Sequence, residues 1–294
     1  MQFDRVIRAK ILLANETYTA YTREIDITNL RMSFNVLKTS ATDANTGDLI
    51  IYNLSAEKRN LITGFGDQLR IFAGYRNSGG AELLFIGSAN QLNHTFNQPD
   101  ITTQLNCGDG ETTLNNTNIA VSFAANTNVR TVIEFIAKQL RFPIAYFAPT
   151  PLGQEEVYTN GFSEIYLART ILESACEKIG MQFSIQNDNM IIIPINGTTE
   201  KPPVVINVQN GMIGVPERYI DKRYYQYNAL IPNEPPKPGY RIRMLLRPDI
   251  LPGDKIRIQS RQIDIDQQMI VYNIRHTGDN YESNFESIIE AFPI

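Results

Sequence analysis

Tryptophan is absent from this 294-residue sequence, and cysteine and histidine each occur only twice. Two cysteines, Cys107 and Cys176, cannot make a disulfide framework. Both stand in apolar patterns, so we predict free thiols buried in a reduced core. The sequence has no His-Glu-x-x-His and no Cys-x-x-Cys motif, so nothing supports a zinc site. We interpret His94 and His276, each in a strand-like stretch, as separate surface or sheet residues.

Long apolar runs and clusters of basic residues are also missing. The longest apolar stretches, such as Met190 to Ile193, are far too short to cross a bilayer, and the N-terminus does not resemble a signal peptide, so we expect no membrane partner. The 27 Lys and Arg against 31 Asp and Glu give a net charge of −4, which disfavours a nucleic-acid binder. Hydrophobic residues make up 43% of the chain, enough for sizeable cores.

Residues 1–115 alternate with a period of two residues. Met32, Phe34 and Val36 point one way, with polar or less apolar residues between them, which predicts a strand with one buried face. Several such strands with regular turns are typical of a β-barrel or a sandwich. One short helix interrupts them, and Ser55 is in position to cap it.

Residues 116–200 change to helical spacing and predict a small α+β domain. Thr127 is the expected N-cap of a first helix, and Ser163 is expected to open a second helix that ends at Gly180. The segment Asn187-Asp188-Asn189 then lies between two apolar runs, which predicts a β-hairpin.

Residues 201–294 are predicted to be β-structure again. A proline-rich loop at 232–238 cannot lie inside a sheet. The strand candidates are Arg241 to Leu246, Lys255 to Ile258, Met269 to Ile274 and Phe285 to Ala291.

Carboxylate pairs are the nearest approach to a catalytic site. They are Asp264 with Asp266, Glu155 with Glu156, and Asp109 with Glu111. Asp264 and Asp266 are two residues apart on a predicted strand, so they would share a face, as a glycosidase needs. Tyrosines that could stack on sugars stand nearby, at Tyr224, Tyr225 and Tyr227. We favour the simpler interpretation, a solvated face of a β-hairpin.

Two other motifs have structural explanations that we prefer. The stretch Gly161-Phe162-Ser163 is the nearest to a serine nucleophile, but a capping role accounts for Ser163. The segment Asp43 to Asp48 resembles a calcium loop without the distant bidentate Glu, and a turn between strands explains it better. We therefore predict no catalytic, cofactor or metal site, and no enzyme activity.

The order of strands and turns resembles the phage tail hub family, that is, baseplate hub or late-control-D-type proteins. The first part of the resemblance is Ile50 to Ser55 with the short helix after it, Leu69 to Tyr75, Leu84 to Gly87, and Cys107 to Gly110. The later part is Gly211 to Glu217, Met244 to Pro248 with Leu251 to Asp254, and His276 to Asp279. The resemblance covers nearly the whole chain.

This resemblance implies a structural virion protein of the tail baseplate, assembled in the host cytoplasm. Its subunits would carry two β-barrel domains, at 1–115 and 201–294, and form a homotrimer that joins a sixfold tail tube to a threefold central spike. Expected partners are the tube or distal tail protein, the spike, and baseplate wedge or tape measure proteins, while DNA passes without specific binding. Two alternatives stay open: a glycan-binding or glycan-cleaving virion protein, and the hub half of a type VI or other contractile injection spike.

Overall fold

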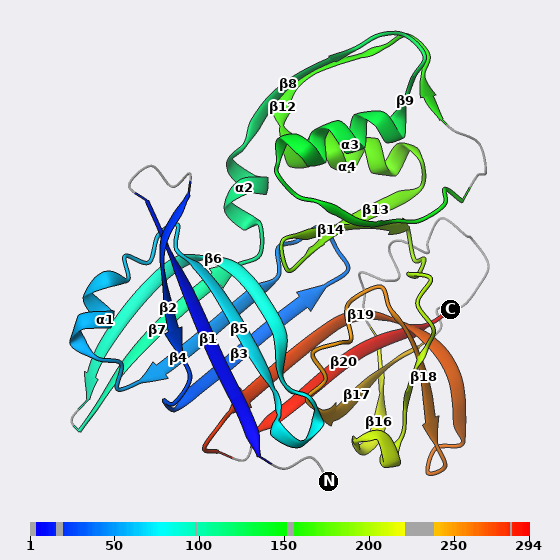
Figure 1. The fold of residues 1–294 in the computed structure, drawn as a ribbon. Coiled ribbons are helices and arrows are strands. Elements are labelled where there is room, and N and C mark those ends of the chain that lie inside the picture. Colours follow the sequence, from blue (N-terminus) through cyan, green and yellow to red (C-terminus); the bar gives the residue numbers. More distant parts are fainter. Residues whose placement is uncertain (1–3, 16–19, 98, 152–155, 221–237, 283) are drawn as a thin grey trace.

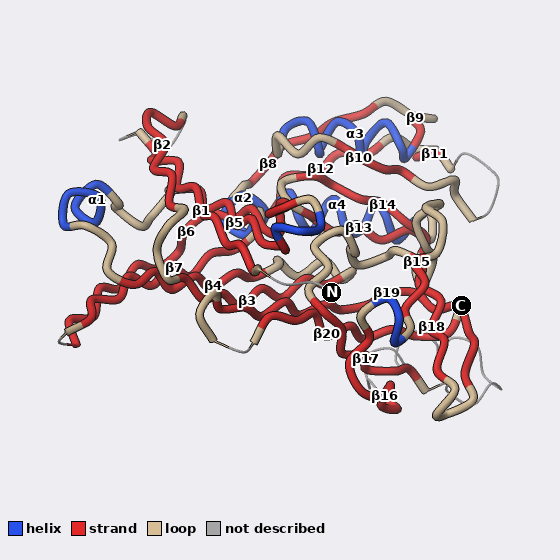
Figure 2. Tube along the Cα trace, turned by 60° about the horizontal axis from the view of Figure 1, so that its bottom comes forward, coloured by secondary structure: helices blue, strands red, loops and turns tan. Residues whose placement is uncertain are grey.

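The computed structural model describes residues 4–15, 20–97, 99–151, 156–220, 238–282 and 284–294. The chain is β-rich, as predicted, with 56% of residues in strands and 15% in helices. Figures 1 and 2 show a large twisted sheet, with helices α3 and α4 gathered in a separate part of the fold. In the described residues, no helix is long and apolar enough to cross a membrane.

Thirteen strands form the large sheet. They are β1 (Arg5–Ala14), β2 (Tyr21–Ile27), β3 (Met32–Thr39), β4 (Thr46–Tyr52), β5 (Gln68–Tyr75), β6 (Gly80–Asn97), β7 (Asp100–Gly108), β15 (Val204–Ile206), β16 (Met212–Tyr219), β17 (Gly239–Leu245), β18 (Lys255–Ser260), β19 (Ile265–Asp279) and β20 (Phe285–Pro293). Along the sheet the order is β16-β17-β20-β19-β3-β4-β7-β6-β5-β1-β2, with β18 on β19 and β15 on β18. Helix α1 (Ala56–Leu61) and the 3-10 turns Arg76–Ser78 and Val208–Asn210 lie in the connections.

The expected pair of β-barrels is not confirmed. In the described residues the pairings follow one open path from β16 to β2, and no part of the sheet closes into a barrel. The N-terminal and C-terminal strands instead join through antiparallel pairing of β3 with β19, where Val36 lies opposite His276. We call this pairing the seam.

Aromatic side chains reinforce the seam from the core side. The ring of Phe285 on β20 meets Phe34 and Tyr75 edge to face, with centroids 6.0 and 5.2 Å apart. The hydroxyl of Tyr75 donates to the Phe285 carbonyl and accepts from the Leu246 N–H, both at 3.2 Å. Because each contact joins β5 or β3 to the C-terminal strands, the two halves of the sheet are held side by side.

Residues 111–194, which we call the insert, form a separate α+β unit. Its elements are α2 (Glu111–Asn116), β8 (Asn118–Phe123), β9 (Thr127–Asn128), α3 (Val129–Gln139), β10 (Ile144–Phe147), β11 (Val157–Tyr158), β12 (Phe162–Leu167), α4 (Ala168–Lys178), β13 (Met181–Gln186) and β14 (Asn189–Pro194). The apolar faces of α3 and α4 pack with β13 and β14 around their own hydrophobic cluster. Two further clusters lie under the N-terminal and C-terminal strands.

Local sequence features explain several element ends. Ser55 caps α1 by accepting from the Lys58 N–H, as predicted. Gly180 follows α4 with φ of +67°, the left-handed conformation expected there. The hairpin β13–β14 turns through Asn187 and Asp188, both at positive φ, which is the backbone of a two-residue type I′ turn.

Two predicted helix starts are wrong. Ser163 lies in strand β12, which pairs with β8, and α4 begins five residues later, where every third or fourth residue from Ala168 is buried. The cap of α3 is Asn128, whose side chain accepts from the Arg130 N–H at 2.8 Å, while the Thr127 hydroxyl donates to the Ala124 carbonyl. Both Thr and Asn are favourable N-cap residues, so capping preference alone could not decide between Thr127 and Asn128.

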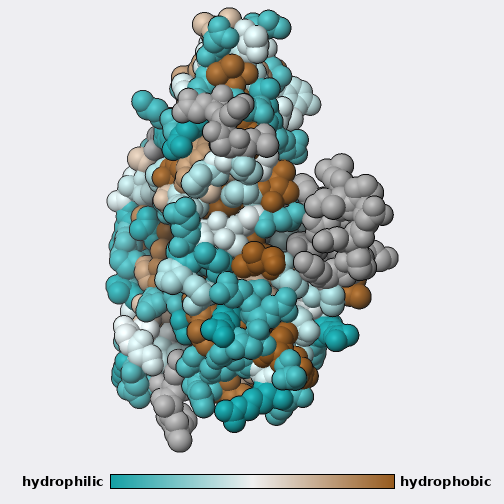
Figure 3. All heavy atoms as spheres, turned by 90° about the vertical axis from the view of Figure 1, so that its right-hand side faces the viewer, coloured by the Kyte–Doolittle hydropathy of each residue, from teal (hydrophilic) through white to brown (hydrophobic). Residues whose placement is uncertain are grey.

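Buried apolar residues leave a mainly hydrophilic exterior. On the side of the molecule drawn in Figure 3, hydrophilic side chains predominate and hydrophobic ones lie in small separate groups. The candidate functional groups are therefore the polar side chains on the surface of the sheet and the buried polar groups.

Candidate functional surface

One face of the large sheet carries polar side chains across the seam, together with the half-buried apolar residues Leu37, Ile50 and Ile288. Successive strand residues alternate between the buried core and this face, which we call the open face and which runs over β17, β20, β19, β3, β4, β7 and β6. On β3, for example, Met32, Phe34 and Val36 are buried, and Asn35 between them is exposed. The alternation predicted for this strand is confirmed.

Strand register aligns the polar side chains into rows. Directly opposite residues form one row that crosses six strands from β20 to β6: Glu286, Thr277, Asn35, Asp48, Asn106 and Gln91. All six are polar, and none carries a positive charge. The side-chain amide of Asn106 donates to Asp48 Oδ1 at 2.6 Å, so neighbouring strands are linked within the row.

Arginines of the open face are largely paired with carboxylates. Arg241 contacts Glu290 at 2.9 Å and Arg243 contacts Glu286 at 2.8 Å. Beside them, Asn273 donates to the second Glu290 oxygen at 3.1 Å. Arg241, Asn273 and Glu290 border a concavity of about 460 Å³, whose lining also includes Arg275, Leu37 and Ile288. The positive charges of Arg241 and Arg243 are thus balanced by the neighbouring carboxylates of Glu290 and Glu286.

A buried polar cluster fixes the insert to the sheet. We call it the polar junction: Lys38, Asn45, Asp109, Gln186, Asn187 and Asp188. Asp109, at the end of β7, is fully buried and accepts from the N–H groups of Asn187 and Asp188 at 2.6 and 3.0 Å. The tip of hairpin β13–β14 therefore binds a carboxylate of the sheet through its own backbone, beside the end of β3 (Figure 1).

Asn45 and Gln186 extend the junction to the end of β3. Asn45 accepts from the Thr39 N–H at 2.8 Å and donates to the Ile185 carbonyl at 2.6 Å. Gln186 donates to the Thr39 carbonyl at 2.8 Å. Since buried polar groups are costly unless they are paired, this network specifies one position of the hairpin on the sheet.

Burial shifts the pKa values of the ionisable groups near the junction. Desolvation lowers the pKa of Lys38 to about 8, although the Asp109 charge opposes this. Desolvation raises the pKa of Asp109 to about 6, against the two backbone N–H bonds that favour its charged form. His276 on β19 is fully buried and its pKa is lowered well below the usual range by desolvation and by Lys38. We infer that His276 is neutral at pH 7.

The cysteines and histidines occupy the places expected of structural residues. Cys107 and Cys176 are free and buried, as predicted, and burial raises the pKa of both thiols, that of Cys176 to about 12. His94 on β6 contacts Thr103 at 3.0 Å, while His276 on β19 contacts Ser287 at 2.8 Å. The sheet order places three strands between β6 and β19, so the fold does not bring the two histidines together.

The predicted carboxylate pairs do not form one site. Asp264 lies in the turn before β19 with positive φ, so the expectation that it shares a strand face with Asp266 is wrong. Asp266 is held by Arg257 through two bonds of 2.6 and 2.8 Å. Glu156 pairs with Lys178 at 3.5 Å. Glu155 and the tyrosines Tyr224, Tyr225 and Tyr227 lie outside the described residues, and Glu111 begins α2.

The calcium-like segment is a connection between β3 and β4, as we preferred. Asp43 pairs with Arg169 at 3.3 Å, Asn45 is buried in the junction, and Asp48 lies on the open face. The three side chains therefore lie in three different environments and do not converge on one point. Within the part of the chain that the structure describes, no three His, Cys, Asp or Glu side chains are grouped to hold a metal ion.

The sequence interpretation missed Lys38. It continues the inward series Met32, Phe34 and Val36, so the alternation places a charged residue on the buried side of the strand. A lysine at such a position needs a polar partner, and it donates to Asn187 Oδ1 at 3.0 Å. The partner was not predictable, because it comes from a hairpin almost 150 residues further along the chain.

The chain is similar to a known protein family in sequence and to solved structures in fold. A family model described as baseplate hub gp41 matches residues 8–219. No curated protein sequence matches the chain.

Solved structures of tail proteins share the fold. A tail protein from Neisseria meningitidis MC58 superposes with a TM-score of 0.66 at 9% identity, covering 99% of this chain and 97% of that chain. The 43 kDa tail protein of prophage MuSo2 from Shewanella oneidensis gives 0.67 at 9% identity, covering 97% and 98%. A component of the Escherichia coli type VI secretion system gives 0.58 at 10% identity, covering 90% and 73%.

The sequence and fold comparisons agree with the resemblance noted from the order of strands and turns. The family match spans both the N-terminal strands and the insert. The chain therefore belongs to the baseplate hub gp41 family and is a structural, virion-associated protein of the phage tail baseplate.

Proposed function

We propose that three copies of this chain close a ring on the tail axis, with the open face turned toward the passage through which DNA leaves. In this arrangement the hub joins the tail tube to the central spike. The observation that carries the proposal is the row of polar residues, none of them cationic, that crosses the seam from β20 to β6.

The scarcity of unpaired positive charge on the open face suits a surface that lines a passage for DNA. Non-specific DNA affinity comes chiefly from Lys and Arg contacts to phosphates. Arg241 and Arg243 are engaged by carboxylates of β20, and the central row consists of amides, carboxylates and one threonine. Arg275 is an exposed cation of this face that forms no ion pair within the described residues. DNA would therefore pass such a surface without being retained.

The division of the chain supports a ring of three. We propose units at 1–115, 116–200 and 201–294. Three hydrophobic clusters, under the N-terminal strands, in the insert and under the C-terminal strands, support a division into three, although Leu114 belongs to the cluster of the insert. Two β units per chain give six β units in a trimer, enough to match a sixfold tube. A head-to-tail contact between copies must close to avoid a filament.

Molecular mass tests the ring. We expect light scattering to give the mass of a trimer, either for the isolated protein or after addition of the spike and tube proteins. A stable monomer in the presence of both partners would contradict the proposal.

A hub in a contractile injection spike is the second candidate, since the type VI component from Escherichia coli has the same fold. Genes for tube, tape measure and sheath beside this gene would assign it to a phage tail, and type VI genes to a secretion system. The glycan-cleaving alternative loses its motivation, because Asp264 and Asp266 lie in different local structures and Arg257 holds Asp266.

A further inference from the structure

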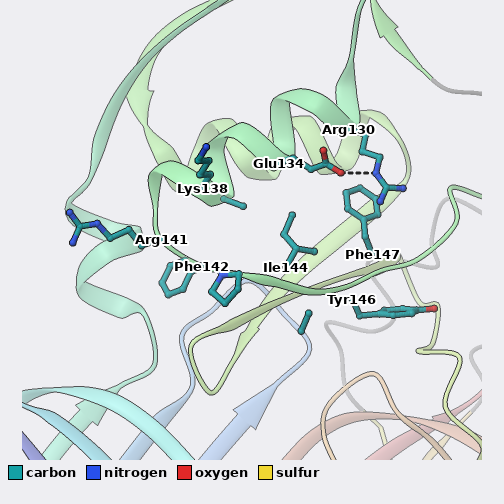
Figure 4. Close-up of a pocket in the computed structure, with 11 residues that line it drawn as sticks. Arg130, Glu134, Lys138, Arg141, Phe142, Ile144, Tyr146 and Phe147 are labelled. Atoms are coloured by element: carbon teal, nitrogen blue, oxygen red, sulfur yellow. Dashed lines mark hydrogen bonds and ion pairs between the residues drawn. The ribbon is translucent and has the colours of Figure 1, made fainter.

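A groove on the insert lies outside the open face and the polar junction. It has a volume of about 700 Å³ and runs between one face of α3 and strand β10. Figure 4 shows Arg130, Glu134 and Phe147 together at one end, Lys138 toward the other, and Ile144 pointing toward α3. The walls are thus a helix and a strand, with apolar and charged side chains between them.

Strand β10 leaves one edge of its sheet open. The small sheet has the order β10-β14-β13, and β10 pairs with β14 in parallel. Across the described residues, no strand pairs with the other edge of β10. An edge strand presents N–H and C=O groups that can pair with another extended chain. The four residues of β10 provide at most about 13 Å of such an edge at about 3.3 Å per residue, and the strand is irregular between Ile144 and Tyr146.

The groove carries an excess of positive charge. Of its ionisable side chains, Arg130, Lys138 and Arg141 are cations and Glu134 is the one carboxylate. Arg130 bonds Glu134 at 2.8 Å and lies over the Phe147 ring at 4.3 Å. Lys138 and Arg141 are exposed, and neither forms an ion pair within the described residues. An occupant with carboxylates would complement them.

We propose that this groove binds an extended, carboxylate-bearing segment of another protein, which adds to β10 as a fourth strand of the small sheet. The backbone edge provides main-chain hydrogen bonds, and Lys138 and Arg141 select acidic side chains. Ile144 and Phe147 provide an apolar surface for alternate residues of the segment. The proposal does not depend on the ring or on the orientation of the open face.

Peptide selection tests this binding mode on the isolated full-length protein. Random 12-residue peptides are selected against the wild type and depleted against Lys138→Glu/Arg141→Glu. We expect enriched peptides to be rich in Asp and Glu and to bind the double variant about tenfold or more weakly, a difference of about 1.4 kcal/mol. Arg23→Glu/Arg261→Glu, which reverses two exposed cations elsewhere, should bind like the wild type.

Hydrogen exchange locates the bound segment. Amides of Ile144 to Phe147 should exchange more slowly with an enriched peptide bound, and replacing its Asp and Glu by Asn and Gln should remove the effect. If the double variant does not fold, Lys138→Gln/Arg141→Gln takes its place. Failure to enrich peptides that distinguish wild type from variant, protection confined to another site, or a dimer of this chain that occupies β10 would overturn the proposal.

Discussion

Asp109 shows how one side chain can position a whole element. A single buried carboxylate accepts from two successive backbone N–H groups at the tip of hairpin β13–β14 and from the Asn45 amide. An amide in its place would keep one acceptor oxygen and add a donor that faces N–H groups. We expect Asp109→Asn to lower the free energy of unfolding by about 1–3 kcal/mol, measured by urea denaturation.

Asp266→Asn is the matched control for this substitution. Asp266 accepts two bonds from Arg257, but both side chains are exposed, so water replaces the lost contacts. The urea midpoint of the control should hardly change. Equal effects of the two substitutions would argue against a fixing role for the polar junction.

His276 should make stability depend on pH. Its pKa in the folded protein is far below the usual value because desolvation and Lys38 disfavour the imidazolium. The unfolded chain takes up a proton below about pH 6.5, and the folded chain does not. The unfolded state thus binds more protons, and stability falls as the pH drops, by up to about 1.4 kcal/mol per unit from this residue.

The comparison of wild type with His276→Gln isolates this contribution. Lys38 and Asp109 titrate in both proteins, so their effects are shared to first order. Between pH 7 and 5, the free energy of unfolding should fall more steeply for the wild type than for the variant. Parallel curves would show that His276 is protonated in the folded state or does not contribute.

Among the elements, β3 and β19 depend on a glycine for their close pairing. Gly278 on β19 lies opposite Phe34 on β3 and Phe285 on β20. A Cβ at this position would lie 2.6 Å from the Phe34 ring and 2.8 Å from the Phe285 ring. We expect Gly278→Ala to cost about 1–3 kcal/mol of stability in urea or thermal denaturation.

Thr277→Ala provides the control at the next residue. The Thr277 side chain points away from the aromatic rings, and its hydroxyl is buried with no hydrogen-bond partner in the described residues, so its truncation removes no bond and should not lower stability. If both alanine variants unfold at the wild-type midpoint, the aromatic packing at the seam does not limit stability.

Elements with strong periodicity were predictable from the sequence, and those decided by distant contacts were not. The alternation in β3 and the hairpin around Asn187 and Asp188 were predicted correctly. A capping residue before an apolar helical pattern predicts a helix start at Ser163, but pairing with β8 keeps that stretch extended. The open face could not be predicted, because it depends on the pairing of β3 with β19, and no local sequence pattern indicates that pairing.

The molecule as a whole is predicted to be indifferent to DNA. With the row from Glu286 to Gln91 facing a passage, double-stranded DNA should show no retardation by the protein at physiological salt. Micromolar or tighter binding of DNA that weakens steeply with salt would contradict the proposal that the open face lines the DNA passage. Asn35→Lys/Asn106→Lys places two cations in the row and should produce salt-dependent retardation, which checks that the assay detects the face.

For the whole molecule, the sequence indicated two β units on either side of an α+β segment. The strand pairing shows that the two β units share one continuous sheet. Two closed barrels were expected from the family resemblance, whereas the described strands form one open path. The difference depends on which strand pairs with β3, and that partner, β19, follows the insert in the sequence.

The pairing of β3 with β19 also has a consequence for biosynthesis. During translation β3 emerges early, yet the strand that covers its edge is made only near the end of the synthesis of the described chain. Contacts so distant in sequence form late, and until then the edge of β3 is open to unwanted association. A nascent or truncated chain without β19 leaves the β3 edge unpaired, so we expect it to associate with other chains more readily than the complete subunit does.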